Sequence, residues 1–159
     1  MKLKNFFKNL NKNFRNISFE GFEFNSQKIK KNYVFFAIQG NKFDGNNFIN
    51  DAIKKGAHVI VSNKFKTGIY KGTYYINVID PRLALSNFAN KYYNNKPNNI
   101  IAVTGTNGKS SIVNFYYQIL KLNKKKVASI GTLGVKSNGV SSELNNTTVD
   151  AITINKILS

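Results

Sequence analysis

The sequence predicts an α/β fold, and three observations support that prediction. Short apolar runs alternate with amphipathic helical patterns over most of the 159 residues. Glycine, asparagine and an Asp-Pro pair separate these segments, as expected of turns and helix starts. Hydrophobic residues make up 42% of the chain and aromatic residues 13%, which is enough for a packed core.

The first 96 residues contain most of the predicted elements. Met1 to Phe14 is basic, with apolar residues at helical spacing, and predicts an amphipathic helix lying on the fold; weak contact with a membrane surface is the alternative. Interspersed lysines and asparagines argue against a signal peptide. Apolar runs bounded by turn residues predict three strands, and 3.6-residue periodicity predicts two helices. The predicted strands are 33–38, 57–61 and 74–79, and the predicted helices are 47–55 and 81–92.

The polar stretch 94–99 contains a proline and predicts a domain boundary, with domains at 1–96 and 97–159. Beyond it, the patterns predict strands 100–103 and 127–130, helices 109–122 and 151–158, and a polar loop or hairpin at 136–146. Helix 109–122 is expected to turn one apolar face inward, formed by Val113, Tyr116, Tyr117 and Leu120. A parallel nucleotide-binding sheet normally has more strands, so 97–159 is expected to be an incomplete domain.

The most informative segment is the loop between strand 100–103 and helix 109–122. Glycines let backbone N–H groups face an anion, the helix start favours negative charge, and a lysine adds a mobile cation. A serine directly after that lysine can bind magnesium. This pattern predicts a cradle for a nucleoside triphosphate, with an ordinary strand-to-helix turn as the alternative. Its residues are Gly105, Thr106, Asn107, Gly108, Lys109, Ser110 and Ser111, of which Ser110 is the expected metal ligand.

The charge of the chain argues weakly for a nucleic-acid partner. The net charge is +17, but only Arg15 and Arg82 are arginine, so 22 of the 24 basic residues are lysine. These lysines are dispersed, which indicates a solvated surface, and we expect no nucleic-acid partner. The absence of cysteine excludes disulfides and thiolate sites and agrees with a cytoplasmic location. His58 has no acid or second ligand near it in the sequence, so no catalytic or metal role is expected.

The order of these elements resembles the Mur ligases of peptidoglycan synthesis, particularly those that add the third peptide residue. Thr104 to Ser111 is similar to their short phosphate loop, which also lacks the first glycine of the common motif. Asn25-Ser26-Gln27 resembles their Asp-Ser-Arg element, and the run 33–40 resembles the strand that follows it. Further similar elements are Asp44-Gly45, the segments 80–85 and 131–134, and Asn146-Thr147-Thr148.

The resemblance implies an N-terminal α/β domain that binds a uridine diphosphate substrate, followed by the start of a central P-loop ATPase domain. It implies an ATP- and Mg²⁺-dependent ligase that joins UDP-N-acetylmuramoyl-L-alanyl-D-glutamate to a diamino acid, diaminopimelate or lysine, and that is monomeric. Lys109 would be the catalytic residue. The residues implied to bind the substrate are Phe24, Ser26, Asn41, Lys42, Phe43, Asn146, Thr147 and Thr148.

Other interpretations stay open at this stage. Asn25 and Gln27 replace the aspartate and arginine of the family motif, which bears on uridine binding. Residues 146–148 could instead cap the last helix. The chain could be a non-catalytic nucleotide-binding remnant, another Mur ligase, or an inactive fragment of one.

Overall fold

The computed structural model describes residues 1–8, 10–40, 43–137, 140–142 and 149–159. Two compact units are present, one formed by 1–95 with 155–159 and the other by 96–154. The sequence-based division at 96/97 placed 155–159 in the second domain, whereas the structure groups these residues with the first unit.

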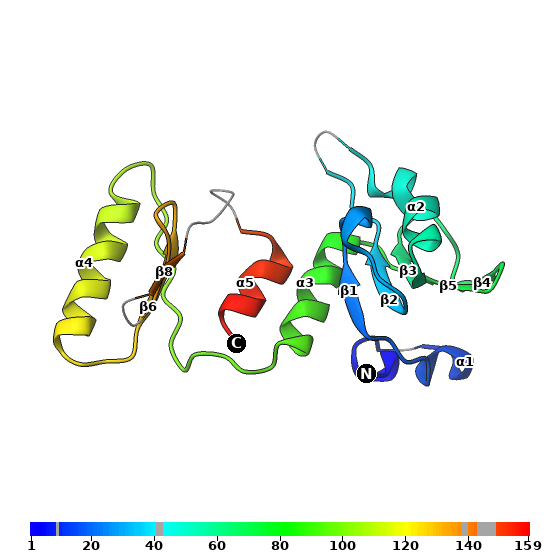
Figure 1. The fold of residues 1–159 in the computed structure, drawn as a ribbon, viewed down its shortest axis with the longest axis horizontal. Coiled ribbons are helices and arrows are strands. Elements are labelled where there is room, and N and C mark those ends of the chain that lie inside the picture. The colour runs from blue at the N-terminus through cyan, green and yellow to red at the C-terminus, as the bar shows by residue number, and fades with distance from the viewer. Residues whose placement is uncertain (9, 41–42, 138–139, 143–148) are drawn as a thin grey trace. The chain divides into compact units, whose positions relative to one another are not determined.

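The first unit is built on a five-stranded sheet with the order β1-β2-β3-β5-β4, in which only β4 is antiparallel to its neighbour (Figure 1). The strands are β1 Gly21–Glu23, β2 Tyr33–Phe36, β3 Ala57–Ser62, β4 Gly68–Tyr70 and β5 Thr73–Asn77. The three predicted strands are confirmed as β2, β3 and β5. The sequence did not indicate β1 and β4, because strands of three residues are too short to show a period.

Helical segments follow the carboxyl ends of β1, β2 and β5 in this unit. They are the 3-10 helices η2 Ser26–Lys28 and η3 Gly45–Phe48 and the α-helices α2 Ile49–Lys54 and α3 Pro81–Tyr92. Asp80 caps α3 as predicted, since its Oδ1 accepts from the backbone N–H groups of Arg82 at 2.8 Å and Leu83 at 3.1 Å. The predicted helix 47–55 corresponds to η3 and α2, which follow each other directly and together cover residues 45–54.

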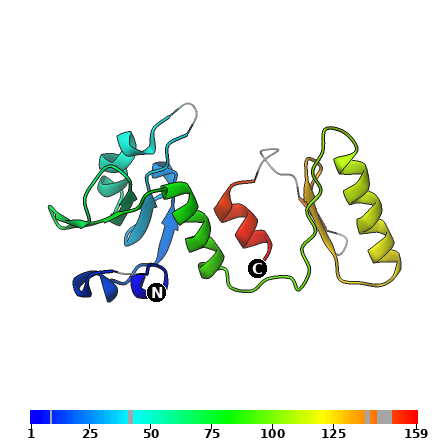
Figure 2. The ribbon, with the colours of Figure 1, turned by 180° about the vertical axis from the view of Figure 1, so that it is seen from behind.

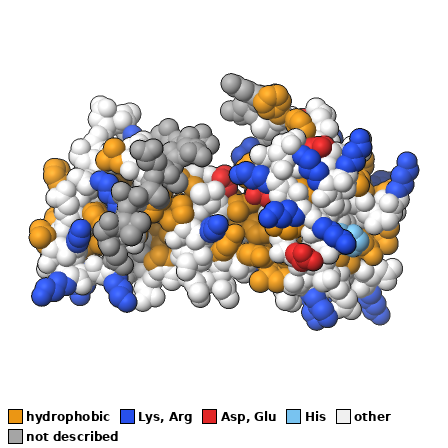
Figure 3. Space-filling model, viewed as in Figure 1, with side chains coloured by type: hydrophobic (Ala, Val, Ile, Leu, Met, Phe, Trp, Pro, Cys, Tyr) orange, Lys and Arg blue, Asp and Glu red, His pale blue; other side chains and the backbone are white. Residues whose placement is uncertain are grey.

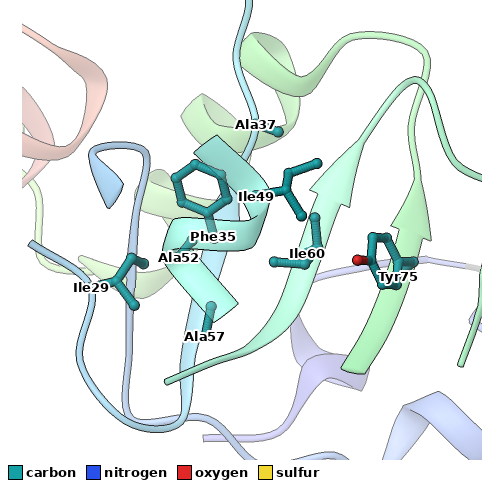
Figure 4. Packing of buried hydrophobic residues seen from close by; sticks show 8 residues of the cluster. All are labelled: Ile29, Phe35, Ala37, Ile49, Ala52, Ala57, Ile60 and Tyr75. Atoms are coloured by element: carbon teal, nitrogen blue, oxygen red, sulfur yellow. The ribbon is translucent and has the colours of Figure 1, made fainter. Parts of the chain in front are cut away.

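Helices α2 and α3 lie on opposite faces of the sheet, and each face carries its own core (Figure 2). On the α2 face, Phe35, Ile49, Ala52 and Ile60 belong to one buried cluster, shown in Figure 4. On the α3 face, Phe88 is 1% exposed and lies among the rings of Phe6, Phe7, Phe19, Phe22 and Phe36. Tyr92 extends this aromatic cluster, in agreement with its interpretation as helix core and rim.

The predicted amphipathic helix over residues 1–14 is wrong. The described residues of this segment form two short helices, η1 Leu3–Asn5 and α1 Lys12–Arg15. Its first residues instead pair with 17–19, through Leu3 N–H donating to Ile17 O and Phe19 N–H donating to Met1 O, each at 3.0 Å. The apolar residues are nevertheless buried as expected, since Leu3 is fully buried and the Phe6 ring stacks on Phe88 at 4.2 Å.

The second unit contains α4 Lys109–Leu122, a meander of β6 Ala128–Gly131, β7 Gly134–Ser137 and β8 Val140–Ser142, and most of α5 Ala151–Ile157. The prediction of a strand at 100–103 is wrong, since Ile100 and Ile101 are each 61% exposed and no described residue pairs with the segment. A strand is stabilised by hydrogen bonds to a partner strand. The next predicted strand along the chain, β6, pairs with β7 and not with residues 100–103.

Helix α4 also differs from the expectation for its inward face. Tyr117 is buried as predicted, but Tyr116 is exposed. Apolar side chains remain uncovered along this helix (Figure 3); they are Ile112, Phe115, Tyr116, Ile119 and Leu122. The second unit therefore has a much smaller core than the first.

Candidate functional site

The predicted phosphate cradle is a bend-rich loop that ends at the first residue of α4. Gly105 has φ +148° and Gly108 has φ +77°, so both glycines have backbone conformations that side-chain-bearing residues rarely adopt. Gly108 is the N-cap of α4, and its carbonyl accepts from Ile112 N–H at 3.0 Å. The N–H groups of the first turn of α4 thus lie beside this loop, where an anion is favoured.

The ammonium group of the exposed Lys109 is hydrogen-bonded to the loop. Its Nζ donates to the backbone carbonyl of Gly105 and to that of Thr106, the latter at 3.1 Å. Here the ammonium group is held by two neutral carbonyl oxygens. The charged phosphate oxygens of a nucleotide would be stronger hydrogen-bond acceptors for it than these carbonyls.

Ser110 has a partner that sequence reasoning did not find. Its Oγ lies 3.1 Å from Oγ1 of Thr132, which is in the turn between β6 and β7. Only the similarity of 131–134 to a family element marked this turn in the sequence. Two hydroxyl oxygens beside a phosphate loop are hard ligands that fit Mg²⁺, although no carboxylate accompanies them among the contacts described.

The expected substrate-binding segments of the first unit begin at the same edge of its sheet. Strands β1 and β2 are parallel neighbours, so the segments that follow them start at the same edge. The Ser26 turn follows β1, and the 40–45 turn follows β2. In open parallel sheets, ligands bind outside this carboxyl edge.

The base of the 40–45 turn is held by several side chains. Asp44 Oδ1 accepts from Asn46 N–H at 2.9 Å, and Asp44 Oδ2 forms an ion pair with Lys64 Nζ at 2.6 Å. The Lys64 ammonium and Asn46 lower the pKa of Asp44 from 3.8 to about 2. Ser62, at the end of β3, donates to Asn46 Oδ1 at 2.7 Å and thereby ties the turn to the sheet.

The predicted substrate residues differ in exposure. Ser26 is 5% exposed, whereas Phe24 is 37% and Phe43 is 71% exposed. Asn41, Lys42, Asn146, Thr147 and Thr148 lie outside the described residues. Asp150 caps α5 by accepting from the N–H groups of Ile152 and Thr153, each at 2.9 Å.

The described residues also bear on metal sites and membrane spans. In the described part of the chain, histidine, aspartate and glutamate side chains form no group of three that could hold a metal ion. His58 contacts the ring of Tyr74 at 4.9 Å, which is a packing role. None of the described helices is long and apolar enough to cross a membrane.

Comparisons with known proteins agree with this geometry. The model of the Mur ligase family catalytic domain matches residues 18–93, and that of the Mur ligase middle domain matches 103–159. A UDP-N-acetylmuramoyl-L-alanyl-D-glutamate–2,6-diaminopimelate ligase of Rickettsia typhi is 43% identical over 94% of this chain and 31% of its own length. A similarly named ligase 2 of Clostridium acetobutylicum is 36% identical over 99% of this chain and 35% of its own.

Solved structures give the same result. A structure of a UDP-N-acetylmuramoyl-L-alanyl-D-glutamate–2,6-diaminopimelate ligase superposes with TM-score 0.69 and 25% identity, covering 88% of this chain and 28% of that one. MurF ligase from Thermotoga maritima, in complex with ADP, superposes with TM-score 0.51 and 30% identity, covering 66% and 24%. The chain thus spans about a third of the length of the curated relatives it matches. Residues 1–159 belong to the Mur ligase family.

Proposed function

We propose that this chain is the N-terminal part of an ATP-dependent ligase that adds a diamino acid, diaminopimelate in the first instance, to UDP-N-acetylmuramoyl-L-alanyl-D-glutamate. The observation that carries this proposal is the loop 104–110, where Lys109 and the start of α4 surround a site suited to phosphate. The relatives with the same order of segments bear the name of that ligase. The proposal places this reaction in the cytoplasm.

The two units would divide the chemistry. Phe24, Ser26 and the 41–43 turn would hold the uridine diphosphate end of the substrate at the carboxyl edge of the first sheet, and residues 146–148 its sugar-peptide end. Lys109 and the loop N–H groups of residues 105–111 would stabilise charge on the phosphoryl group that ATP transfers to the substrate carboxylate. Ser110 would hold the Mg²⁺ that accompanies ATP, with Thr132 keeping its hydroxyl in place.

The test is a chimera in which residues 1–159 replace the matching part of the Rickettsia typhi relative. Lys109→Ala should abolish ATP binding and lower substrate-dependent phosphate release at least about 100-fold, because a preorganised charge on the phosphoryl group is lost. Lys121→Ala, an exposed lysine in the last turn of the same helix, is the matched control. Equal ATP affinity in Lys109→Ala and Lys121→Ala would refute the assignment of the loop.

Two outcomes would lead to other conclusions. A chimera that binds ATP and UDP but never ligates would favour a non-catalytic nucleotide-binding remnant. A chimera that ligates another amino acid or a different peptide substrate would identify another member of the family.

A further inference from the structure

Basic side chains gather at the N-terminal end of the first unit. Five of the 24 basic residues of the chain lie within residues 1–15, whereas Glu20 is the first acidic residue from the N-terminus. Four of these five form, together with a lysine of α3, a surface that we call the basic patch. Its members are all exposed; they are Lys4, Lys8, Lys12, Arg15 and Lys91.

The tertiary structure brings these side chains together, because no single helix carries them. Lys4 belongs to η1, Arg15 to α1 and Lys91 to the last turn of α3. Lys91 Nζ donates to the backbone carbonyl of Phe6 at 3.1 Å, which links α3 to the N-terminal segment. Because the first residues of the chain pair with 17–19 just before β1, the patch lies at the amino end of this strand (Figure 1). The proposed substrate-binding turns follow the carboxyl ends of β1 and β2, so the patch is a separate site.

The basic patch lines two open hollows in the protein surface. The first has a volume of about 390 Å³, and its lining residues are Lys4, Lys12, Arg15 and Asn16. The second has a volume of about 410 Å³, and its lining residues are Lys4, Phe7, Lys8, Leu10, Arg15 and Lys91. Both hollows therefore combine several cations with no acidic side chain in their described linings, and the second adds two apolar side chains.

The positive charge of the patch is not neutralised within the described residues. The ion pairs found there join α2 lysine to α2 aspartate and Lys64 to Asp44, and none involves the patch. Glu20, the nearest acidic residue in the sequence, accepts from Asn32 Nδ2 at 2.9 Å instead. Cations that line the same hollow repel one another unless an anion lies among them, so the patch favours a partner with several negative charges.

We propose that the basic patch docks on the phosphate headgroups of an anionic lipid surface. Lysine and arginine are attracted to such a surface, and the long stems of lysine let the ammonium groups reach headgroups that are spread over it. Phe7 and Leu10 are each half-buried beside the cations, so their exposed parts would meet the boundary between headgroups and acyl chains. Such a contact is peripheral and reversible, and it needs no continuous amphipathic helix.

A nucleic acid, the other common polyanion, fits this surface less well. Base recognition uses arginine forks, and base stacking uses free aromatic faces. The patch has a single arginine, Arg15. Phe7 is the only aromatic ring among the described residues that line the hollows, and it packs against Phe88 with ring centroids 5.6 Å apart. A lipid surface requires neither feature.

The test is sedimentation of residues 1–159 with vesicles made of equal parts of phosphatidylglycerol and phosphatidylcholine. Binding should be measurable at low ionic strength, weaken as salt is added, and be absent with vesicles of phosphatidylcholine alone. Each basic residue near an anionic surface contributes about fivefold to binding. The triple variant Lys4→Gln, Lys12→Gln, Arg15→Gln should therefore bind about 100-fold more weakly than wild type.

The matched control removes three charges from the longest run of lysines, through Lys124→Gln, Lys125→Gln and Lys126→Gln. These lysines are exposed, and the control has the same net charge as the triple patch variant. The control should bind vesicles like wild type. If the triple patch variant does not fold, as judged by thermal unfolding, Lys12→Gln and Arg15→Gln as single variants carry the test, each with a loss of about fivefold.

Three outcomes would overturn the proposal. Equal losses in the patch variant and the control would show that the net charge of the chain, and not the patch, attracts the membrane. No binding of wild type to the anionic vesicles would remove the lipid partner. Binding of a single-stranded RNA that the patch variant loses, with vesicle binding unchanged, would assign the patch to nucleic acid. None of these outcomes bears on the proposed ligase function, because the substrate-binding turns follow the opposite ends of the strands.

Discussion

Gly45→Ala should disturb the turn that we assign to the substrate nucleotide. A Cβ atom on Gly45 would lie 2.6 Å from both the backbone N and O of Ile38 and 2.9 Å from the carbonyl carbon of Ala37. All three are backbone atoms just beyond β2, and Ala37 is fully buried, so they have little room to move. The overlap would also stretch the 2.9 Å hydrogen bond from Gly45 N–H to Ile38 O.

Overpacking of this kind costs about 1–3 kcal/mol in the free energy of unfolding. We therefore expect Gly45→Ala to lower the urea midpoint of the first unit and to weaken UDP binding, while ATP binding stays unchanged. Gly131→Ala is the control, because a Cβ there meets no atom within 4 Å and its φ is not positive. Equal stability and equal UDP affinity in both variants would show that the close approach at Gly45 is not what shapes the turn.

Three further predictions concern the core, the ion pair and the chain itself. Phe88→Ala removes the ring at the centre of the aromatic cluster and should destabilise the first unit by about 3–5 kcal/mol in chemical unfolding; a loss below about 1 kcal/mol would contradict the packing described. The pKa of Asp44, followed by NMR, should be about 2 and should rise toward 3.8 in Lys64→Met. Because the folded-state pKa is depressed, the contribution of this ion pair to stability is present above about pH 4 and is lost as the pH falls toward 2. An unchanged pKa of Asp44 in Lys64→Met would show that Lys64 does not lower it. Residues 1–159 alone should release no phosphate from ATP above background when given the UDP-linked dipeptide and diaminopimelate. In-line phosphoryl transfer needs both substrates to be held together in the right geometry. Substrate-dependent phosphate release would refute this prediction.

Local patterns in the sequence were sufficient for much of the first unit. The strands β2, β3 and β5 are rich in β-branched, aromatic and other apolar residues, and the Asp80-Pro81 start of α3 depends only on neighbouring residues. The loop around Lys109 was recognisable for the same reason, since glycines, a lysine and a helix start lie next to one another in the chain.

Contacts between distant segments decided the rest. Residues 1–14 have helical periodicity, yet pairing of 1–3 with 17–19 replaced the helix. The run 100–103 is apolar, yet it is no strand, because strand formation requires a partner and none pairs with it in the described residues. The pairing of Ser110 with Thr132 and the link from Gln27 to Asp51 join residues 22 and 24 positions apart. Sequence periodicity reports the environment along one segment, whereas these contacts depend on which segments the fold brings together.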